Sequence, residues 1–254
     1  MELAKSDAYK ILSVLGCLVT EIPETDERRA DLRAVDASSS YIVEVKHKLD
    51  DIELLREHSK RMANGEVVMR SEPLSRNNRI DAILKNAQDQ LEQTPKSAGE
   101  FRLIWFHAGG IDRDLHWKRA FATFYGFVQL IAIDPPSNDK IDCFYFDFSA
   151  AWAMPQVDAM VLSDASGLQL CLNEFSNRSD DFARTDLCHK LSSGLVDPRE
   201  LCAKGLIIAL RSGVSRKDEA VVLKALYDQT GVRYTPLRPT QHSASAMINA
   251  GIVT

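Results

Sequence analysis

The chain has 254 residues, of which 45% are hydrophobic, so it can bury a substantial core in one elaborated domain or two small ones. Its 31 basic and 36 acidic residues give a formal net charge of -5 at pH 7. This balance excludes an overall positive field that would attract nucleic acid or an anionic membrane. Any site for a polyanion must therefore be local.

The cysteines are odd in number and widely spaced, with no Cys-x-x-Cys pair. This pattern argues against a disulfide framework and a structural zinc site, and it favours the reducing cytoplasm. The N-terminal segment carries charges where a signal peptide would be apolar. No run approaches the roughly 20 apolar residues of a membrane span, so we expect no membrane partner. The cysteines are Cys17, Cys143, Cys171, Cys188 and Cys202.

Apolar periodicity and Gly or Pro breakers predict alternating helices and strands in the first half of the chain. Residues between the third strand and the next long helix change to a charged, mainly helical insert. The expected elements are a helix at 2–15, strands at 17–22, 31–35 and 41–47, a helical insert at 49–78, a helix at 79–94, a strand at 101–107, a helix at 112–126 and strands at 127–134 and 143–149.

The second half is less regular, with a hairpin pattern at 159–175, an apolar run at 206–212, a helix at 217–231 and a short strand at 232–237. We find no internal repeat and no low-complexity tract. The expected class is α/β, with a core over 1–149 and a C-terminal α/β elaboration over 150–254.

The second and third predicted strands form a hairpin that brings charged residues together. Strand alternation puts Glu44 and Lys46 on one face. A symmetric turn centred between Ala37 and Ser38 pairs Asp31 with Glu44. Two opposed carboxylates lie about 5 Å apart at Cβ and repel each other unless a positive charge lies between them.

A divalent cation would satisfy both carboxylates, and oxygen ligands with open positions suit Mg²⁺ or Mn²⁺. Lys46 would then lie where it could orient or deprotonate a water, or stabilise charge on a phosphate. The alternative is a solvated hairpin face in which Lys46 bridges two acids, worth at most about 1 kcal/mol.

These residues resemble the motif of the PD-(D/E)xK nuclease superfamily, and the order of elements over roughly the first 110 to 130 residues is similar to that of the restriction-endonuclease-like fold. The resemblance implies a central mixed β-sheet flanked by helices. It also implies that Asp31, Glu44 and the carbonyl of Val45 bind the metal, and that Lys46 serves the attacking water.

The chain departs from the family pattern at several positions. Ala30 replaces the proline that precedes the aspartate. The glutamate that the family often has on its first helix could correspond to Glu2 or to Asp7. The glutamine of the crossover helix could be Gln88 or Gln90. The insert before that helix is longer than in a minimal core.

The resemblance implies a Mg²⁺-dependent nuclease acting on nucleic acid, with DNA favoured and a second copy of the chain as a candidate partner. The alternatives are a nuclease-fold module that binds nucleic acid or protein without cleaving, and an α/β protein whose hairpin is purely structural. Arg76 and Arg79 flank two asparagines at a helix start and are the candidate phosphate contacts, with a structural role in the loop or the helix cap as the alternative.

Other polar residues are more simply explained as structural. The remaining basic residues of the insert are matched by acids, His107 ends a strand, and Cys188 beside His189 has no nucleophile pattern around it. The sequence lacks a Gly-rich phosphate loop with lysine, a His-Glu-x-x-His and a Gly-x-Ser-x-Gly motif. ATP-driven, zinc-protease and serine-hydrolase functions therefore find no support.

Overall fold

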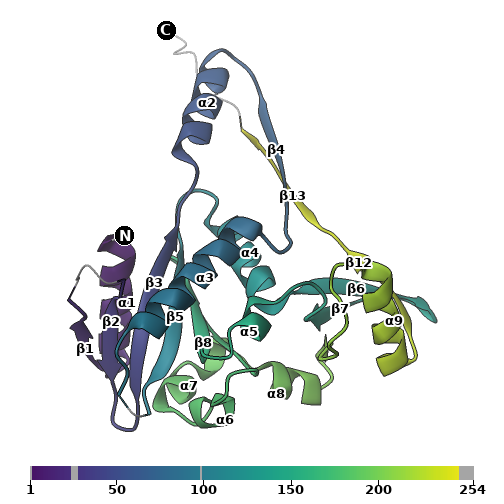
Figure 1. Cartoon of the computed structure of the whole chain (residues 1–254). Coiled ribbons are helices and arrows are strands. Elements are labelled where there is room, and N and C mark those ends of the chain that lie inside the picture. The colour runs from purple at the N-terminus through teal and green to yellow at the C-terminus, as the bar shows by residue number, and fades with distance from the viewer. Residues whose placement is uncertain (1, 24–27, 98, 246–254) are drawn as a thin grey trace.

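The computed structural model describes residues 2–23, 28–97 and 99–245. These residues form a mixed α/β fold with a central mixed sheet that carries helices on both faces (Figure 1). The strands of this main sheet follow the order β1 (Leu18–Glu21), β2 (Leu32–Val35), β3 (Ser40–Lys48), β5 (Phe101–Ala108), β8 (Ala159–Ser163), β9 (Leu168–Leu172) and β10 (Leu195–Val196).

The main sheet combines an antiparallel meander with a parallel centre. β1, β2 and β3 are antiparallel, β3, β5 and β8 run parallel, β9 is antiparallel to β8, and β10 is parallel to β9. Because parallel neighbours require a crossover, the chain between β3 and β5 must pass across one face of the sheet. Helix α3 (Asn78–Gln93) lies in this crossover.

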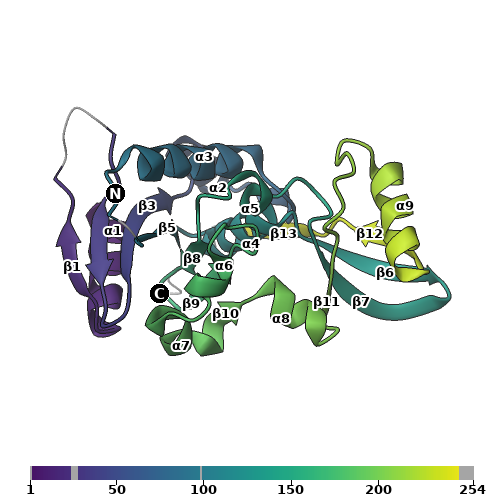
Figure 2. The ribbon, with the colours of Figure 1, turned by 60° about the horizontal axis from the view of Figure 1, so that its bottom comes forward.

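Each face of the main sheet has its own core. On one face, Tyr41, Val43 and Val45 of β3 pack with buried residues of α1 (Glu2–Val14) and of the short helices α6 (Ser179–Phe182) and α7 (Asp186–Lys190). On the other, Ile42 of β3 packs with residues of α3, α4 (Arg113–Tyr125) and α5 (Ala150–Ala153) (Figure 2). Strand alternation therefore separates the two cores, as predicted for β3.

A second sheet stands beside the first, with the order β11 (Ile207–Ala209), β7 (Pro136–Phe144), β6 (Val128–Asp134) and β12 (Arg233–Leu237). Helix α9 (Glu219–Thr230) covers it, and a separate core contains Leu130, Phe146 and Leu226. The 3₁₀ turn η1 (Ser192–Gly194) and helix α8 (Pro198–Ala203) lie in the chain that leads from the main sheet to β11.

An arm projects from the body of the molecule (Figure 1). It consists of α2 (Ile52–Ala63), which has no buried residue, and of strand β4 (Val68–Pro73) paired antiparallel with β13 (Thr240–Ser245). The insert is therefore not purely helical as expected. The pairing with β13 could not be read from local pattern, because the partner strand is distant in sequence and mostly exposed.

The predicted elements of the first 126 residues match the described helices and strands, except for β4. The strand expected at 143–149 is displaced: β7 ends at Phe144, so it overlaps the expected range only at its first two residues, and it pairs with β6 as a hairpin. The division expected after residue 149 coincides with no boundary between sheets, since β8 and β9 continue the main sheet and β6 and β7 join the second. Within the described residues, no helix is long and apolar enough to cross a bilayer.

Candidate metal centre

The β2–β3 hairpin brings Asp31 to Glu44. Leu32 pairs with Val43 in the observed register, which confirms the pairing frame predicted from the turn. Asp31 directly precedes β2, and its Oδ2 accepts a hydrogen bond of 2.9 Å from the backbone N–H of Val45. This bond holds the Asp31 carboxylate against β3 at Val45, the residue next to Glu44.

Glu44 is deeply buried although it carries a carboxylate. Its exposed fraction is 1%, and its Oε1 lies 2.6 Å from the Lys46 ammonium. The Oε2 atom is buried and accepts no hydrogen bond from the described residues, while a hydrogen-bond contact between the carboxyl groups of Glu44 and Asp31 contributes to the raised pKa of Glu44. A solvated hairpin face is thereby contradicted. An unpartnered buried oxygen is costly, and this one lies beside a second carboxylate.

Lys46 alone does not balance the negative charge of the two carboxyl groups, Asp31 and Glu44. Burial raises the pKa of the Glu44 carboxyl to about 8, the negative charge of Asp31 adds to the rise, and the Lys46 ammonium opposes it. A net rise means that one cation is too little to offset desolvation and the second carboxylate. Additional positive charge would lower this pKa again.

Helix α3 fixes the ammonium of Lys46 through two side-chain amides. Lys46 Nζ donates to Asn86 Oδ1 at 2.8 Å and to Gln90 Oε1, and Gln90 Nε2 donates in turn to the backbone carbonyl of Arg29. Of the two glutamines weighed from sequence, Gln90 reaches the site, whereas Gln88 binds Glu92 on the exposed side of the helix. Asn86 was not predicted.

The arrangement offers oxygen donors of the kind that Mg²⁺ and Mn²⁺ prefer. A strand residue points its N–H and its carbonyl to the same side, so the carbonyl of Val45 faces the Asp31 side together with its N–H. In the described part of the chain, no group of three or more His, Cys, Asp or Glu side chains could hold a metal ion. A cation here would therefore depend on Asp31, Glu44, a backbone carbonyl and solvent or substrate.

Among the described contacts, neither candidate acid of the first helix reaches Asp31, Glu44 or Lys46. The side chain of Glu2 lies outside the described residues. Burial and the neighbouring His107 lower the pKa of His47, and the negative charge of Asp7 partly opposes this shift. His47 and His107 pack with ring centroids 5.1 Å apart, and strand alternation puts His47 on the face opposite Glu44.

A polar cavity of about 440 Å³ lies further along β3. Lys48, two residues and about 7 Å beyond Lys46, is part of its lining. Arg76 and Arg79 line the same cavity, but the Arg76 guanidinium is engaged by Asn78 and Asp81. Arg79 is exposed.

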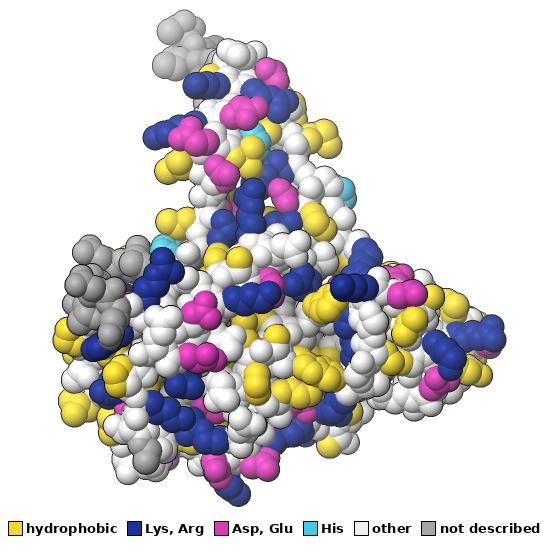
Figure 3. All heavy atoms as spheres, viewed as in Figure 1, with side chains coloured by type: hydrophobic (Ala, Val, Ile, Leu, Met, Phe, Trp, Pro, Cys, Tyr) yellow, Lys and Arg dark blue, Asp and Glu magenta, His cyan; other side chains and the backbone are white. Residues whose placement is uncertain are grey.

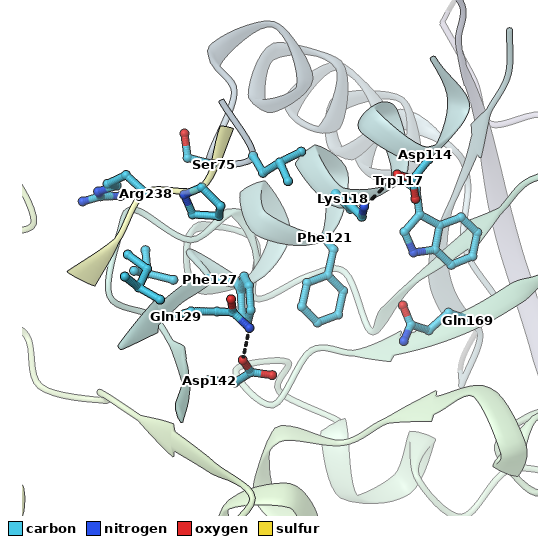
Figure 4. Close-up of a pocket in the computed structure, with 14 residues that line it drawn as sticks. Ser75, Asp114, Trp117, Lys118, Phe121, Phe127, Gln129, Asp142, Gln169 and Arg238 are labelled. Carbon is cyan, nitrogen blue, oxygen red and sulfur yellow. Dashed lines mark hydrogen bonds and ion pairs between the residues drawn. The ribbon is translucent and has the colours of Figure 1, made fainter. Parts of the chain in front are cut away.

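A larger cavity of about 460 Å³ lies between α4 and the second sheet (Figure 4). Trp117 and Phe121 of α4 and Phe127 supply aromatic walls, and Gln129 bonds Asp142 at its edge. Asp31, Glu44 and Lys46 are not among its lining residues.

No family model, curated protein or solved structure matches the chain. What the site does is therefore inferred from its own residues.

Proposed function

We propose that this chain has a restriction-endonuclease-like core and is a metal-dependent nuclease that hydrolyses phosphodiester bonds in nucleic acid, with DNA as the favoured substrate. The observation that carries the proposal is the buried, unpartnered Oε2 of Glu44 beside the carboxylate of Asp31. The sequence order of a helix, an antiparallel meander, a crossover helix and a parallel strand supports the same assignment.

Asp31, Glu44 and the carbonyl of Val45 would hold Mg²⁺ or Mn²⁺. Such an ion, when bound, lowers the pKa of water and neutralises charge on a phosphate. The residues fit this group because their donors are all oxygen and because the buried Oε2 of Glu44 accepts no hydrogen bond from the described residues.

Lys46 contributes a hydrogen-bond donor that is already held in position. Its ammonium is fixed by Glu44 on the strand and by Asn86 and Gln90 on the helix, so it does not have to be ordered when substrate arrives. Preorganised donors stabilise charge that develops on phosphate oxygens. In the proposed reaction, Lys46 orients the attacking water or binds a phosphate oxygen.

The five cysteines are unbridged, and this fits a protein of the reducing cytoplasm. The proposed substrates in that compartment include foreign or damaged DNA. The described chain is not strongly basic, so we expect contact with nucleic acid to depend on local groups and to weaken as salt rises.

The test is cleavage of labelled single-stranded and duplex DNA and RNA with Mg²⁺ or Mn²⁺. Wild type is compared with Lys46→Ala and with Lys48→Ala, a matched lysine on the same strand that donates only to the carbonyl of Leu49. We expect Lys46→Ala to lose cleavage at least 100-fold and Lys48→Ala to retain it. Equal cleavage by all three would contradict the proposal, and binding without cleavage would favour the non-catalytic nuclease-fold module.

A further inference from the structure

Two exposed aromatic side chains flank a cavity on the α5 side of the molecule. Phe148 and Trp152 are 45% and 37% exposed, and both line a cavity of about 310 Å³ formed with the loop 212–217. Figure 3 shows hydrophobic side chains gathered over α5, with lysine and arginine side chains around them. A cavity of this volume is at the lower end of the range for small-ligand pockets.

The cation beside Trp152 is fixed by the backbone. The Arg216 guanidinium donates to the carbonyls of Tyr145, Leu210, Ser212 and Val214, and it lies 5.6 Å from the centre of the Trp152 ring. No carboxylate contacts this guanidinium within the described residues. Its positive charge is therefore preorganised and not neutralised locally.

Two further cations border the aromatic pair. The Arg76 guanidinium lies 5.8 Å from the centre of the Phe148 ring. Lys217 lines the cavity, is exposed, and makes no side-chain hydrogen bond or ion pair in the part of the chain that the structure describes. Surfaces that bind unpaired nucleotides typically combine aromatic side chains with neighbouring arginine and lysine side chains.

Arg76 connects this surface to the candidate metal centre. It lines the polar cavity that Lys48 of β3 also lines, and it lies two residues before α3, the helix whose Asn86 and Gln90 fix Lys46. From Asn78 to Asn86 the helix rises about 12 Å, a distance that an extended strand crosses within a few nucleotides. A bound strand could therefore reach both places.

We propose that Phe148, Trp152, Arg216 and Lys217 form a binding surface for single-stranded nucleic acid, with a base stacked on Phe148 and a phosphate on Lys217. Trp152 forms the wall of this surface, because Phe175 already packs on its ring with centroids 4.6 Å apart. The proposal rests on the proposed nuclease function and names its substrate as an unpaired strand. A duplex hides the faces of its bases, whereas a single strand can present them to aromatic side chains.

The experiment measures binding of a fluorescently labelled 15-nucleotide oligothymidine and of a duplex of equal length by anisotropy. The full chain is used in EDTA, so that no cleavage occurs. We expect the single strand to bind at least about tenfold more tightly than the duplex. Equal or tighter binding of the duplex would overturn the proposal.

Phe148→Ala should weaken binding of the oligothymidine about tenfold or more, because one base loses its stacking partner. The matched control is Tyr227→Ala on α9, which removes another exposed ring that carries an arginine, Arg233, 5.8 Å from its centre. Tyr227 does not line the cavity, so binding should not change. Equal affinities of the two variants would overturn the proposal.

Lys217→Ala tests the phosphate contact at an exposed position where folding is not at risk. We expect binding to weaken about threefold to tenfold and the slope of log K against log salt to become shallower by about 0.7, the effect of one phosphate on a single strand. An unchanged slope would overturn this assignment. Since binding is measured without metal, its loss leaves the cleavage by Asp31, Glu44 and Lys46 to be judged separately.

Discussion

Two carboxylates of the main sheet are buried to the same depth, yet only one has its oxygen atoms satisfied. Glu44 on β3 and Asp158 at the start of β8 are each 1% exposed. Glu44 has one partnered oxygen and one unpartnered oxygen. Asp158 accepts three hydrogen bonds, from the N–H of Arg102 at 2.8 Å, the guanidinium of Arg178 at 2.7 Å and the hydroxyl of Ser176 at 2.5 Å.

The difference teaches that burial of an acid does not by itself mark a functional site. Buried polar groups are normally hydrogen-bonded, and an acceptor left without a partner costs about 1–3 kcal/mol. Asp158 follows this rule and joins two strands and a loop. Glu44 does not follow this rule, since its buried Oε2 accepts no hydrogen bond and lies near the carboxylate of Asp31. We expect a bound cation to satisfy this oxygen.

The sharpest contrast comes from removing Asp158. Asp158→Ala leaves the N–H of Arg102 and the hydroxyl of Ser176 without their acceptor and removes the carboxylate that pairs with Arg178, so the free energy of unfolding should fall by about 3–5 kcal/mol with no dependence on metal. Urea denaturation measures it. The matched control Asp181→Ala breaks an exposed pair with Arg184 and should cost under about 1 kcal/mol. Equal losses would remove the structural role assigned to Asp158.

Metal binding should stabilise the protein, and this stabilisation should require the carboxylate of Asp31. At a Mn²⁺ concentration of 100 times Kd, the free energy of unfolding should rise by about 2.7 kcal/mol. Asp31→Asn can still accept the bond from Val45 but loses the charge, so the rise should disappear. Thermal unfolding with and without Mn²⁺ checks this, with Asp181→Asn as control. The same rise in Asp31→Asn would argue against the site.

The amide side chains of α3 should matter less than the charges. Gln90→Ala removes one of the two amides that fix Lys46, and single-turnover cleavage should slow about tenfold, or about 1.4 kcal/mol. Gln88→Ala, which loses only its bond to Glu92 on the same helix, should leave the rate unchanged. Cleavage that is slowed equally by both would indicate a general effect on α3.

The last prediction concerns pH, whose effect on stability accumulates gradually over several pH units. The pKa of Glu44 is about 8 in the folded state, against about 4.3 for an unfolded glutamate. Between these values the folded state holds a proton that the unfolded state has lost, so rising pH should lower the free energy of unfolding in EDTA by about 1.4 kcal/mol per pH unit. Glu44→Gln should remove this slope. Identical pH dependence in both proteins would mean that Glu44 is ionised when folded.

The hairpin and the placement of Asp31, Glu44 and Lys46 could be predicted because they depend on local rules. Strand alternation fixes the face, and the turn fixes the register, so three residues in two adjacent strands could be brought together without tertiary information. The burial of Glu44 could not be predicted in this way, since the covering helix comes from a different part of the chain.

Other features depend on contacts between distant segments. Asn86 and Gln90 lie four residues apart on a helix whose position was predicted, but its rotation toward Lys46 is set by packing. Strand β7 was misplaced because its mostly exposed residues lack an alternating pattern. The loop 212–217 carries no recognisable motif, and its cavity exists only because α5 lies against it.

The pairing of β4 with β13 also has a consequence for how the protein is made. Ribosomes add about 5–20 residues per second, so β4 leaves the ribosome about 10 to 30 s before its partner. Until then β4 presents an unpaired edge beside the exposed side chains of Val67 and Met69. The nascent chain should therefore have a defined interval in which chaperones can recognise the arm, and this interval should close when β13 emerges.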